Sequence, residues 1–168
     1  MKRACIITYD EYRNIPYVND YEEILTSNEI EYDFIFWNRS EDNIASYNGK
    51  GTAHIFDWRV KKSKISKILP FFLWSRFARK VLKNNNYDFL VVCTTIPAVL
   101  LADKLIRKYN GKYLFDIRDF TYENIGLYKA VLKKLVVASG INVISSKGFL
   151  KWLPEGGEYV CTHNITMH

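Results

Sequence analysis

The stretch 87–117 reads YDFLVVCTTIPAVLLADKLIRKYNGKYLFDI and places one helical repeat between two apolar runs. The run 87–93 is apolar at successive positions, which is typical of a strand buried on both faces of a parallel sheet. Apolar residues then recur at helical spacing over 98–109, with Thr95 as the predicted N-cap. A second apolar run follows at 112–117. This order predicts a strand–helix–strand unit with parallel strands.

The same alternation extends in both directions along the chain. Strands are predicted at 3–9, 31–38, 53–58, 87–93, 112–117, 141–145 and 158–164. Helices are predicted at 20–28 with Asn19 as N-cap, at 70–85, 98–109 and 123–139, and as a short helix at 147–153. We therefore predict an α/β fold: a Rossmann-like, doubly wound parallel sheet of about seven strands with helices on both faces. Residues 1–168 are expected to form a single domain.

Composition narrows the class of protein. The chain has 168 residues, of which 48% are hydrophobic and 25% are charged, which suits a domain with a sizeable core rather than a disordered chain. The three cysteines, at 5, 93 and 161, lie in apolar runs and form no CxxC, so we expect free buried thiols. The longest apolar run, 68–74, is far too short to span a bilayer.

One segment makes the protein basic. The net charge is +6, yet residues 59–83 hold nine of the 24 Lys and Arg residues and no acid, interleaved with large apolar side chains. We expect these residues to meet a membrane surface that carries anionic headgroups. The alternatives are a core helix with a basic outer face and a nucleic-acid site. The side chains predicted to face the membrane are Lys61, Lys62, Lys64, Lys67, Phe71, Phe72, Trp74 and Arg76.

Polar side chains follow most of the predicted strands. Because ligands of such sheets bind beyond the carboxyl ends of the strands, these residues are the candidate binding site. Hydroxyl and carboxylate groups predominate, which suits a polyhydroxylated ligand. The candidates are Tyr9, Asp10, Tyr12, Thr94, Thr95, Arg118, Asp119, Glu123, Ser145, Ser146, His163 and Asn164.

Several of these residues also have structural interpretations. Asp119 could cap a helix, and Arg118 could pair with a neighbouring acid. Asp116 lies within a predicted strand and is expected to hydrogen-bond the backbone or Arg118. Ser145 and Ser146 could form the N-cap of the short helix that follows.

Familiar cofactor and metal motifs are absent from the sequence. No GxGxxG follows the first predicted strand, and neither GxxxxGK[ST] nor HExxH occurs. The three histidines, at 54, 163 and 168, show no useful ligand spacing. We expect no metal and no cofactor in this chain.

Residues 87–164 resemble the N-terminal half of bacterial GT-B glycosyltransferases, in particular the retaining, metal-independent group called glycosyltransferase group 1 or family 4. The resemblance rests on three short motifs in order: DIRD at 116–119, SS at 145–146 and HN at 163–164. Members of this group act in capsule, exopolysaccharide and lipopolysaccharide assembly. The first 60 residues are similar only in pattern.

The resemblance implies a division of labour between two Rossmann-like domains. The N-terminal domain mainly binds the acceptor, while the C-terminal domain holds the nucleotide-sugar with a Glu-x7-Glu pair. Glu23 and Glu31 have this spacing but lie near the N-terminus, so we treat the match as chance. The chain thus resembles half an enzyme, either a truncated piece or one subunit of a split transferase, and we expect it to be inactive alone.

The resemblance also implies partners and a role for Asp119. The expected partners are a glycan or lipid-linked acceptor and a donor-binding domain or subunit, and the expected location is the cytoplasmic face of the plasma membrane. Asp119 occupies the loop where the family often contacts the sugar. Its carboxylate would stabilise positive charge in the transition state of glycosyl transfer, with Arg118 holding it in place.

Two hypotheses from other classes stay open at this point. A standalone receiver-like or flavodoxin-like module would share the doubly wound fold. Asp10 and Glu11 follow the first strand as in a receiver, but Trp58 and Arg59 follow Asp57 where small residues are expected. A nucleic-acid-binding protein could use the basic segment 59–83.

Overall fold

The computed structural model describes residues 2–39, 47–59, 68–119 and 125–162. Within these ranges, seven strands form a sheet in the order β3-β2-β1-β4-β5-β6-β7, and inside each of the two units described below the neighbouring strands pair in parallel. This confirms the predicted Rossmann-like α/β fold. The chain divides into two compact units, Met1–Asp88 and Phe89–His168, which are described separately below. A single domain over 1–168 stays a prediction.

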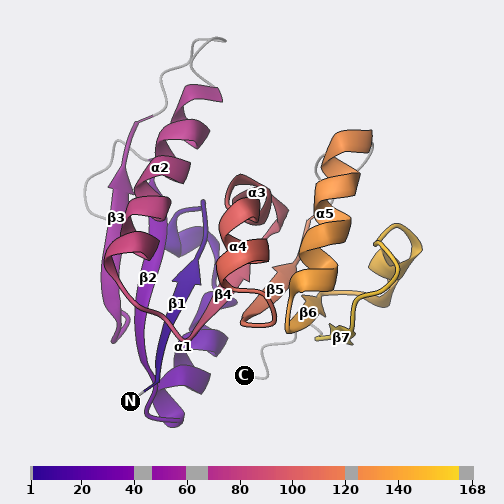
Figure 1. Ribbon diagram of the computed structural model, residues 1–168. Helices are drawn as coiled ribbons and strands as arrows, with labels where there is room; N and C mark the ends of the chain where they lie inside the picture. The colour runs from indigo at the N-terminus through magenta and orange to yellow at the C-terminus, as the bar shows by residue number, and fades with distance from the viewer. Residues whose placement is uncertain (1, 40–46, 60–67, 120–124, 163–168) are drawn as a thin grey trace. The chain divides into compact units, whose positions relative to one another are not determined.

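The elements follow the predicted alternation (Figure 1). The strands are β1 (Arg3–Ile7), β2 (Glu31–Asn38), β3 (Thr52–Asp57), β4 (Phe89–Cys93), β5 (Tyr113–Ile117), β6 (Ile141–Ile144) and β7 (Tyr159–Cys161). The α-helices are α1 (Val18–Ser27), α2 (Ile68–Asn84), α3 (Thr95–Leu100), α4 (Ala102–Lys108) and α5 (Gly126–Ala138). Two 3₁₀ helices, η1 (Tyr12–Asn14) and η3 (Lys147–Lys151), complete the description.

Helical segments cover both faces of the sheet in the first unit. Successive side chains of β2 point to opposite faces, as in any strand. The ring of Trp37 lies 5.6 Å from that of Phe71 on α2, whereas Phe36 contacts Tyr12 of η1 at 6.2 Å between ring centroids. Because six successive residues of β2 are buried, both faces are packed, as predicted for a central parallel strand.

A polar network lies within the packed part of the first unit. The carboxylate of Asp33 on β2 accepts hydrogen bonds from Arg3 at 2.8 Å and from Tyr87 at 2.6 Å, and it lies 2.7 Å from Nε2 of His54. Burial alone would raise the pKa of Asp33, but these three partners together lower it. Asp33 therefore ties β1 and β3 to β2 by charged hydrogen bonds.

In the second unit, α3, α4 and α5 gather beside the strands β4 to β6 (Figure 1). Leu105 of α4 and Leu132 and Leu135 of α5 are fully buried. The hydroxyl of Tyr113 on β5 donates to the carbonyl of Leu135, which fixes α5 to the sheet. Polar side chains follow directly after the carboxyl ends of β4, β5 and β6.

Two predicted helix starts are wrong. Asn19 lies inside α1, whose N-cap is Tyr17, and its side-chain oxygen lies 3.2 Å from the Tyr12 hydroxyl instead of capping the helix. Thr95 is the first residue of α3 rather than its N-cap, which is Thr94. In both cases the helix begins one or two residues earlier than the position of the cap-forming side chain predicts.

The predicted helix 98–109 is divided into α3 and α4. The two helices meet at Leu101, whose φ of −110° departs from helical values. Its amide is shared between the carbonyls of Pro97 and Ala98 at 3.0 and 3.2 Å, so the last turn of α3 tightens before α4 begins.

The prediction of free buried thiols is correct for two of the three cysteines. All three cysteines are free; Cys5 and Cys93 are buried and Cys161 is partly exposed. In the described part of the chain, no helix combines the length and the apolar character that a membrane span requires.

Candidate functional site

The carboxyl ends of three neighbouring strands in the second unit bring the main candidates together. Cys93 of β4 pairs with Asp116 of β5, and Ile117 of β5 pairs with Ile144 of β6. The residues that follow these strands therefore leave the sheet at one edge. They are Thr94 and Thr95 after β4, Arg118 and Asp119 after β5, and Ser145 and Ser146 after β6.

Thr94 has an unusual backbone conformation. Its φ is 72° and its ψ is 164°, a combination that is essentially restricted to glycine. A β-branched residue in this region is a genuine outlier, because its Cβ collides with the backbone. The Thr94 amide donates to the carbonyl of Asp116 at 2.8 Å, which holds the strained residue against β5. Strain of this kind concentrates at ligand and active sites.

Two buried hydroxyl groups at this edge lack partners. Thr94 and Thr95 are 6% and 0% exposed, and within the described part of the chain neither side-chain oxygen makes a hydrogen bond. Buried hydroxyls are normally paired, because leaving one unpaired costs about 1–3 kcal/mol. The pair therefore provides two hydrogen-bonding groups beside the strained residue.

Asp119 extends from β5 to the start of α3. Its Oδ1 accepts a hydrogen bond from the Thr95 amide at 3.3 Å. The carboxylate thus caps the beginning of the helix that follows β4, rather than the helix that follows it in sequence. This contact lies between residues 24 positions apart, and it places a negative charge next to the two threonines.

Arg118 and Asp116 form a buried ion pair. Nε of Arg118 donates to Oδ2 of Asp116 at 2.7 Å, and the two side chains are 12% and 0% exposed. The prediction that Asp116 interacts with Arg118 is therefore confirmed. Burial raises the pKa of the neighbouring Cys93 thiol, and the Asp116 charge raises it further. Cys93 is consequently a neutral thiol rather than a nucleophile.

The serines after β6 differ in their surroundings. Oγ of Ser146 accepts a hydrogen bond from the Gly148 amide at 3.2 Å, so it is the N-cap of η3, as the structural interpretation of the sequence predicts. Ser145 is half-buried at the strand end.

The predicted residues after β1 belong to the first unit. Asp10 forms an ion pair with Arg39 at 3.7 Å, and the Tyr9 carbonyl accepts a hydrogen bond from the same guanidinium at 2.6 Å. Tyr12 instead points into the unit, where its hydroxyl donates to Glu22 at 3.0 Å. Burial, together with the Glu22 charge, raises the pKa of Tyr12 to about 12.

Arg39 is not among the residues predicted for the site. Its guanidinium carbon lies 4.2 Å from the ring centroid of Trp37 and 4.8 Å from that of Tyr9, in the range of cation–π contacts. Arg39 follows β2 directly, so a search for polar residues after every strand would have found it. It fixes the segment after β1 to the end of β2.

The predicted membrane-facing residues divide into two groups. Trp74 is fully buried, which corrects the prediction, and Phe71 packs on Trp37. Both face the sheet because they lie one turn apart on the inner side of α2. Phe72 is 58% exposed, and Arg76 one turn later is also exposed.

Other predicted residues lie outside the described ranges. These are Glu123, His163 and Asn164 of the binding site and Lys61, Lys62, Lys64 and Lys67 of the basic segment. Across the described residues, no group of three His, Cys, Asp or Glu side chains could hold a metal ion.

Comparisons with known proteins identify the fold. No protein-family model matches the sequence, and no curated protein matches it. The structure is similar to sucrose-phosphate synthase from Thermosynechococcus elongatus, with a TM-score of 0.69 and 10% sequence identity over 97% of this chain. The chain spans 48% of that protein. A second sucrose-phosphate synthase chain from the same organism matches at a TM-score of 0.68 and 10% identity, over 99% of this chain and 91% of that one.

These similarities support a GT-B-like fold for the chain. At 10% identity the likeness concerns the fold, and it carries no substrate from one protein to the other.

Proposed function

We propose that this chain is the acceptor-binding domain of a glycosyltransferase that transfers a sugar from a nucleotide-sugar to a glycan or lipid-linked acceptor. The fold supports the class, and the resemblance of 87–164 to enzymes of capsule, exopolysaccharide and lipopolysaccharide assembly supports the acceptor class. The donor is bound by a second domain or subunit, and this chain is inactive alone.

The observation that carries the proposal is the group formed by Thr94, Thr95 and Asp119. The strained backbone of Thr94 and the two buried hydroxyls without partners indicate a site that a ligand completes. Hydroxyls that can donate and accept, beside a carboxylate that accepts, match the hydroxyl groups of a sugar.

Besides binding the acceptor, Asp119 has a catalytic role in this proposal. Glycosyl transfer proceeds through an oxocarbenium-like transition state with developing positive charge. A carboxylate held in place by the Thr95 amide and next to the acceptor stabilises that charge without reorganising. Arg118 is a positioning residue here, because its guanidinium is directed to Asp116 and fixes the loop that carries Asp119.

Replacing Asp119 separates the catalytic role from the capping role. In this chain combined with its donor-binding domain, Asp119→Asn should leave the free energy of unfolding nearly unchanged, since Asn and Asp cap helices about equally well. Turnover should fall by about 10²-fold or more, as expected for the loss of one electrostatic or acid–base group. Sugar-transfer rates at saturating acceptor, together with urea denaturation, measure both quantities.

Asp119→Ala provides the matched control, because it removes the cap and the charge together. It should lose about 1 kcal/mol of stability as well as turnover. Near-normal turnover of the Asp119→Asn variant would leave Asp119 as a helix cap only and remove the chemical part of the proposal.

Membrane docking through α2 is a further part of the proposal. The exposed side chains of α2 recur at helical spacing and form what we call the α2 stripe, with two apolar residues followed by three bases. It consists of Leu69, Phe72, Arg76, Lys80 and Lys83. An apolar start and a basic continuation on one face fit the interface of an anionic bilayer, where lipid-linked acceptors are presented.

The receiver-like and flavodoxin-like alternatives do not fit the strand order. In those folds β1 lies between β2 and β3. Here β3 pairs directly with β2, from Asp33 and Thr52 to Asn38 and Asp57. The first unit therefore has the order of a dinucleotide-binding half.

A further inference from the structure

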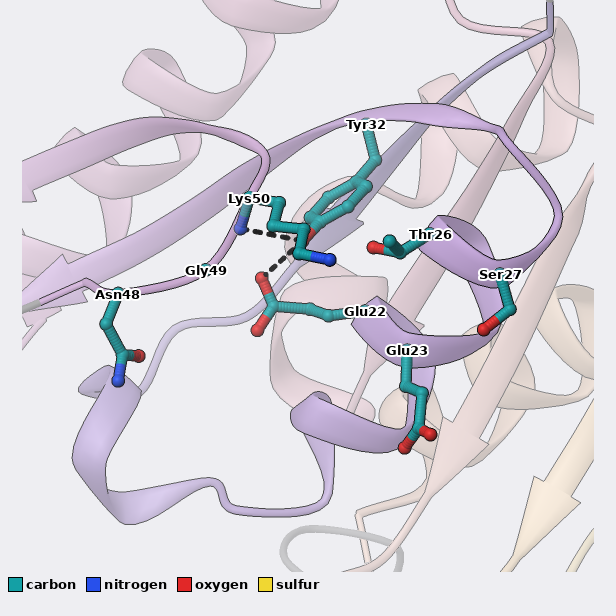
Figure 2. A pocket seen from close by; sticks show the side chains of 8 residues that line it. All are labelled: Glu22, Glu23, Thr26, Ser27, Tyr32, Asn48, Gly49 and Lys50. Atoms are coloured by element: carbon teal, nitrogen blue, oxygen red, sulfur yellow. Dashed lines mark hydrogen bonds between the residues drawn. The ribbon is translucent and has the colours of Figure 1, made fainter.

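A cavity of about 410 Å³ lies in the first unit, away from the carboxyl ends of its strands. Its walls come from the second half of α1, the start of β2 and the segment before β3 (Figure 2). It therefore opens at the amino ends of β2 and β3. The lining residues are Glu22, Glu23, Thr26, Ser27, Tyr32, Asn48, Gly49 and Lys50.

The inner wall of the cavity is a carboxylate surrounded by tyrosines. Glu22 is 7% exposed, and it accepts hydrogen bonds from the hydroxyls of Tyr12 at 3.0 Å, Tyr32 at 3.0 Å and Tyr47 at 2.6 Å. Burial raises the pKa of Tyr12 and of Tyr47, so both hydroxyls stay protonated and donate at neutral pH. A carboxylate can accept about four hydrogen bonds. Three donors therefore leave Glu22 one further position.

Two glycines let the segment before β3 close tightly on this carboxylate. A Cβ added at Gly49 would lie 2.3 Å from Oε1 of Glu22, and one added at Gly51 would lie 2.4 Å from the Tyr32 ring. Between them, the Lys50 amide donates to the Tyr32 hydroxyl at 3.2 Å. The backbone at 49–51 is thus held by the same groups that hold Glu22, which gives the cavity a fixed wall.

Polar side chains surround the opening without partners of their own. Figure 2 shows the Thr26 hydroxyl and the Lys50 ammonium directed into the same space near Glu22. Within the described ranges, five lining side chains make no intramolecular hydrogen bond or ion pair. They are Glu23, Thr26, Ser27, Asn48 and Lys50.

We propose that this cavity binds a single sugar unit, with a preference for an amino sugar, as a site separate from the one proposed at Thr94, Thr95 and Asp119. Glu22 would accept a hydrogen bond from a sugar hydroxyl or ammonium group, while Lys50 and Asn48 would donate to sugar oxygens. The lining holds two carboxylates, of Glu22 and Glu23, and one ammonium group, of Lys50. Its net charge is therefore negative, which favours a cationic sugar. The cavity volume lies in the range of small-molecule sites.

Titration of the complete 168-residue chain with single sugars tests the site. The probes are glucosamine, glucose and cyclohexanol, and the readout is the amide chemical shift of Gly49, Lys50 and Gly51. Glucosamine should shift these amides in a saturable way at millimolar concentration, glucose more weakly, and cyclohexanol not at all.

Two variants and two matched controls locate the binding. Glu22→Gln removes the charge from the inner wall, and Ser27→Trp fills the opening without touching the Glu22 hydrogen bonds; each should weaken glucosamine binding at least 10-fold. Ile24→Trp adds the same ring to α1 outside the cavity, and Glu155→Gln removes a carboxylate in the other unit. Both controls should stay within twofold of the unmodified chain.

Two results would overturn the inference. One is the absence of saturable shifts with any of the sugars at up to about 50 mM, far above a dissociation constant of about 1 mM. The other is unchanged glucosamine affinity in folded Ser27→Trp. Neither result bears on Asp119, whose replacement is read in turnover, so the failure of this site and the failure of the proposed function are distinguishable.

Discussion

At the scale of single residues, Thr94 stores strain that its neighbours hold in place. A conformation restricted to glycine costs a β-branched residue about 1–3 kcal/mol, and the hydrogen bond from Thr94 to Asp116 and the beginning of α3 oppose its relaxation. A glycine would adopt the same backbone without cost. The threonine side chain is consistent with a function that requires its hydroxyl.

Thr94→Gly should therefore keep or increase stability while it weakens acceptor binding. The relief of strain exceeds or balances the entropic cost of glycine, about 0.5–1 kcal/mol. We expect a free energy of unfolding between unchanged and about 1 kcal/mol higher, measured by urea denaturation. Thr95→Gly is the matched control: it lies in ordinary helical backbone and should lose about 1 kcal/mol or more. An equal loss in both variants would contradict the strain at Thr94.

The pKa of Asp33 predicts how the stability of the first unit changes at acidic pH. Its pKa is lower in the folded chain than the usual value near 3.9, because hydrogen bonds from Tyr87, His54 and Arg3 outweigh burial. A lowered folded pKa contributes stability that is complete above the unfolded pKa and is lost as the pH falls through the folded pKa. The stabilising effect of Asp33 should therefore be present at pH 6 and fade below about pH 4.

Tyr87→Phe tests this network. Without the 2.6 Å hydrogen bond, the pKa of Asp33 should rise toward its ordinary value. The variant should be less stable at pH 6 and should lose less further stability between pH 6 and pH 3 than the unmodified chain. Tyr109→Phe, which alters a buried tyrosine of the second unit, should keep the unmodified acid response. An unchanged acid response in Tyr87→Phe would contradict the role of this hydrogen bond.

At the scale of elements, the strands follow from local pattern and the helix starts do not. β2 begins and ends at the predicted residues because its apolar run is bounded by polar residues on both sides. The division at Leu101 depends on how its amide is shared, and the start of α3 depends on Asp119, which follows β5. The first depends on hydrogen-bond geometry within the helix and the second on a contact between residues 24 positions apart, and hydrophobic periodicity reveals neither.

In the candidate site, too, some features follow from short segments of the sequence and others depend on contacts between distant residues. Thr94, Arg118 and Asp119 could be placed at one edge from the strand ends alone. The strain at Thr94 could not be predicted, because nothing in a TT pair requires a positive φ. The cluster at Glu22 was also missed, because its tyrosines come from positions 12, 32 and 47 and are brought together only by the fold.

The α2 stripe belongs to this scale, because its effect depends on the spacing of five side chains along one helix. Leu69 and Phe72 are 53% and 58% exposed, so their replacement costs the fold little. Leu69→Ser with Phe72→Ser should weaken binding to anionic vesicles several-fold, and replacing Arg76, Lys80 and Lys83 with Gln should remove most of the salt-sensitive part. Vesicle co-sedimentation at low and physiological salt measures both effects.

A control variant on α1 tests whether any exposed apolar side chain on a helix contributes to vesicle binding. Ile24 is 57% exposed on a helix that carries Asp20 and Glu23, so Ile24→Ser should leave vesicle binding unchanged. Sedimentation that is absent, or equal in all variants, would make the α2 stripe only the outer face of a packed helix. Salt-sensitive binding to RNA in place of vesicles would favour the nucleic-acid hypothesis.

At the scale of the whole molecule, the charged side chains at the carboxyl ends of the strands disfavour the binding of a phosphate group. In the first unit Arg39 faces Asp10, and in the second Arg118 is bonded to Asp116. Each of these two guanidiniums is thus opposed by a carboxylate, while Arg59, which follows β3, is exposed. After β1 the chain continues with Asp10 and Glu11 rather than a glycine-rich loop that would cradle a phosphate.

The isolated chain should therefore bind nucleotide-sugars weakly or not at all. A pyrophosphate placed after β1 or β5 would meet Asp10, Glu11 or Asp119 and would have to displace an aspartate to reach Arg39 or Arg118. Calorimetry with a panel of UDP- and GDP-sugars should give dissociation constants no tighter than about 1 mM, which corresponds to about −4 kcal/mol. Arg118→Lys should change this little, because the buried guanidinium serves Asp116 rather than a ligand. Micromolar binding of any nucleotide-sugar would instead make the chain an independent nucleotide-binding module, and the division of acceptor and donor between two domains would no longer explain its function.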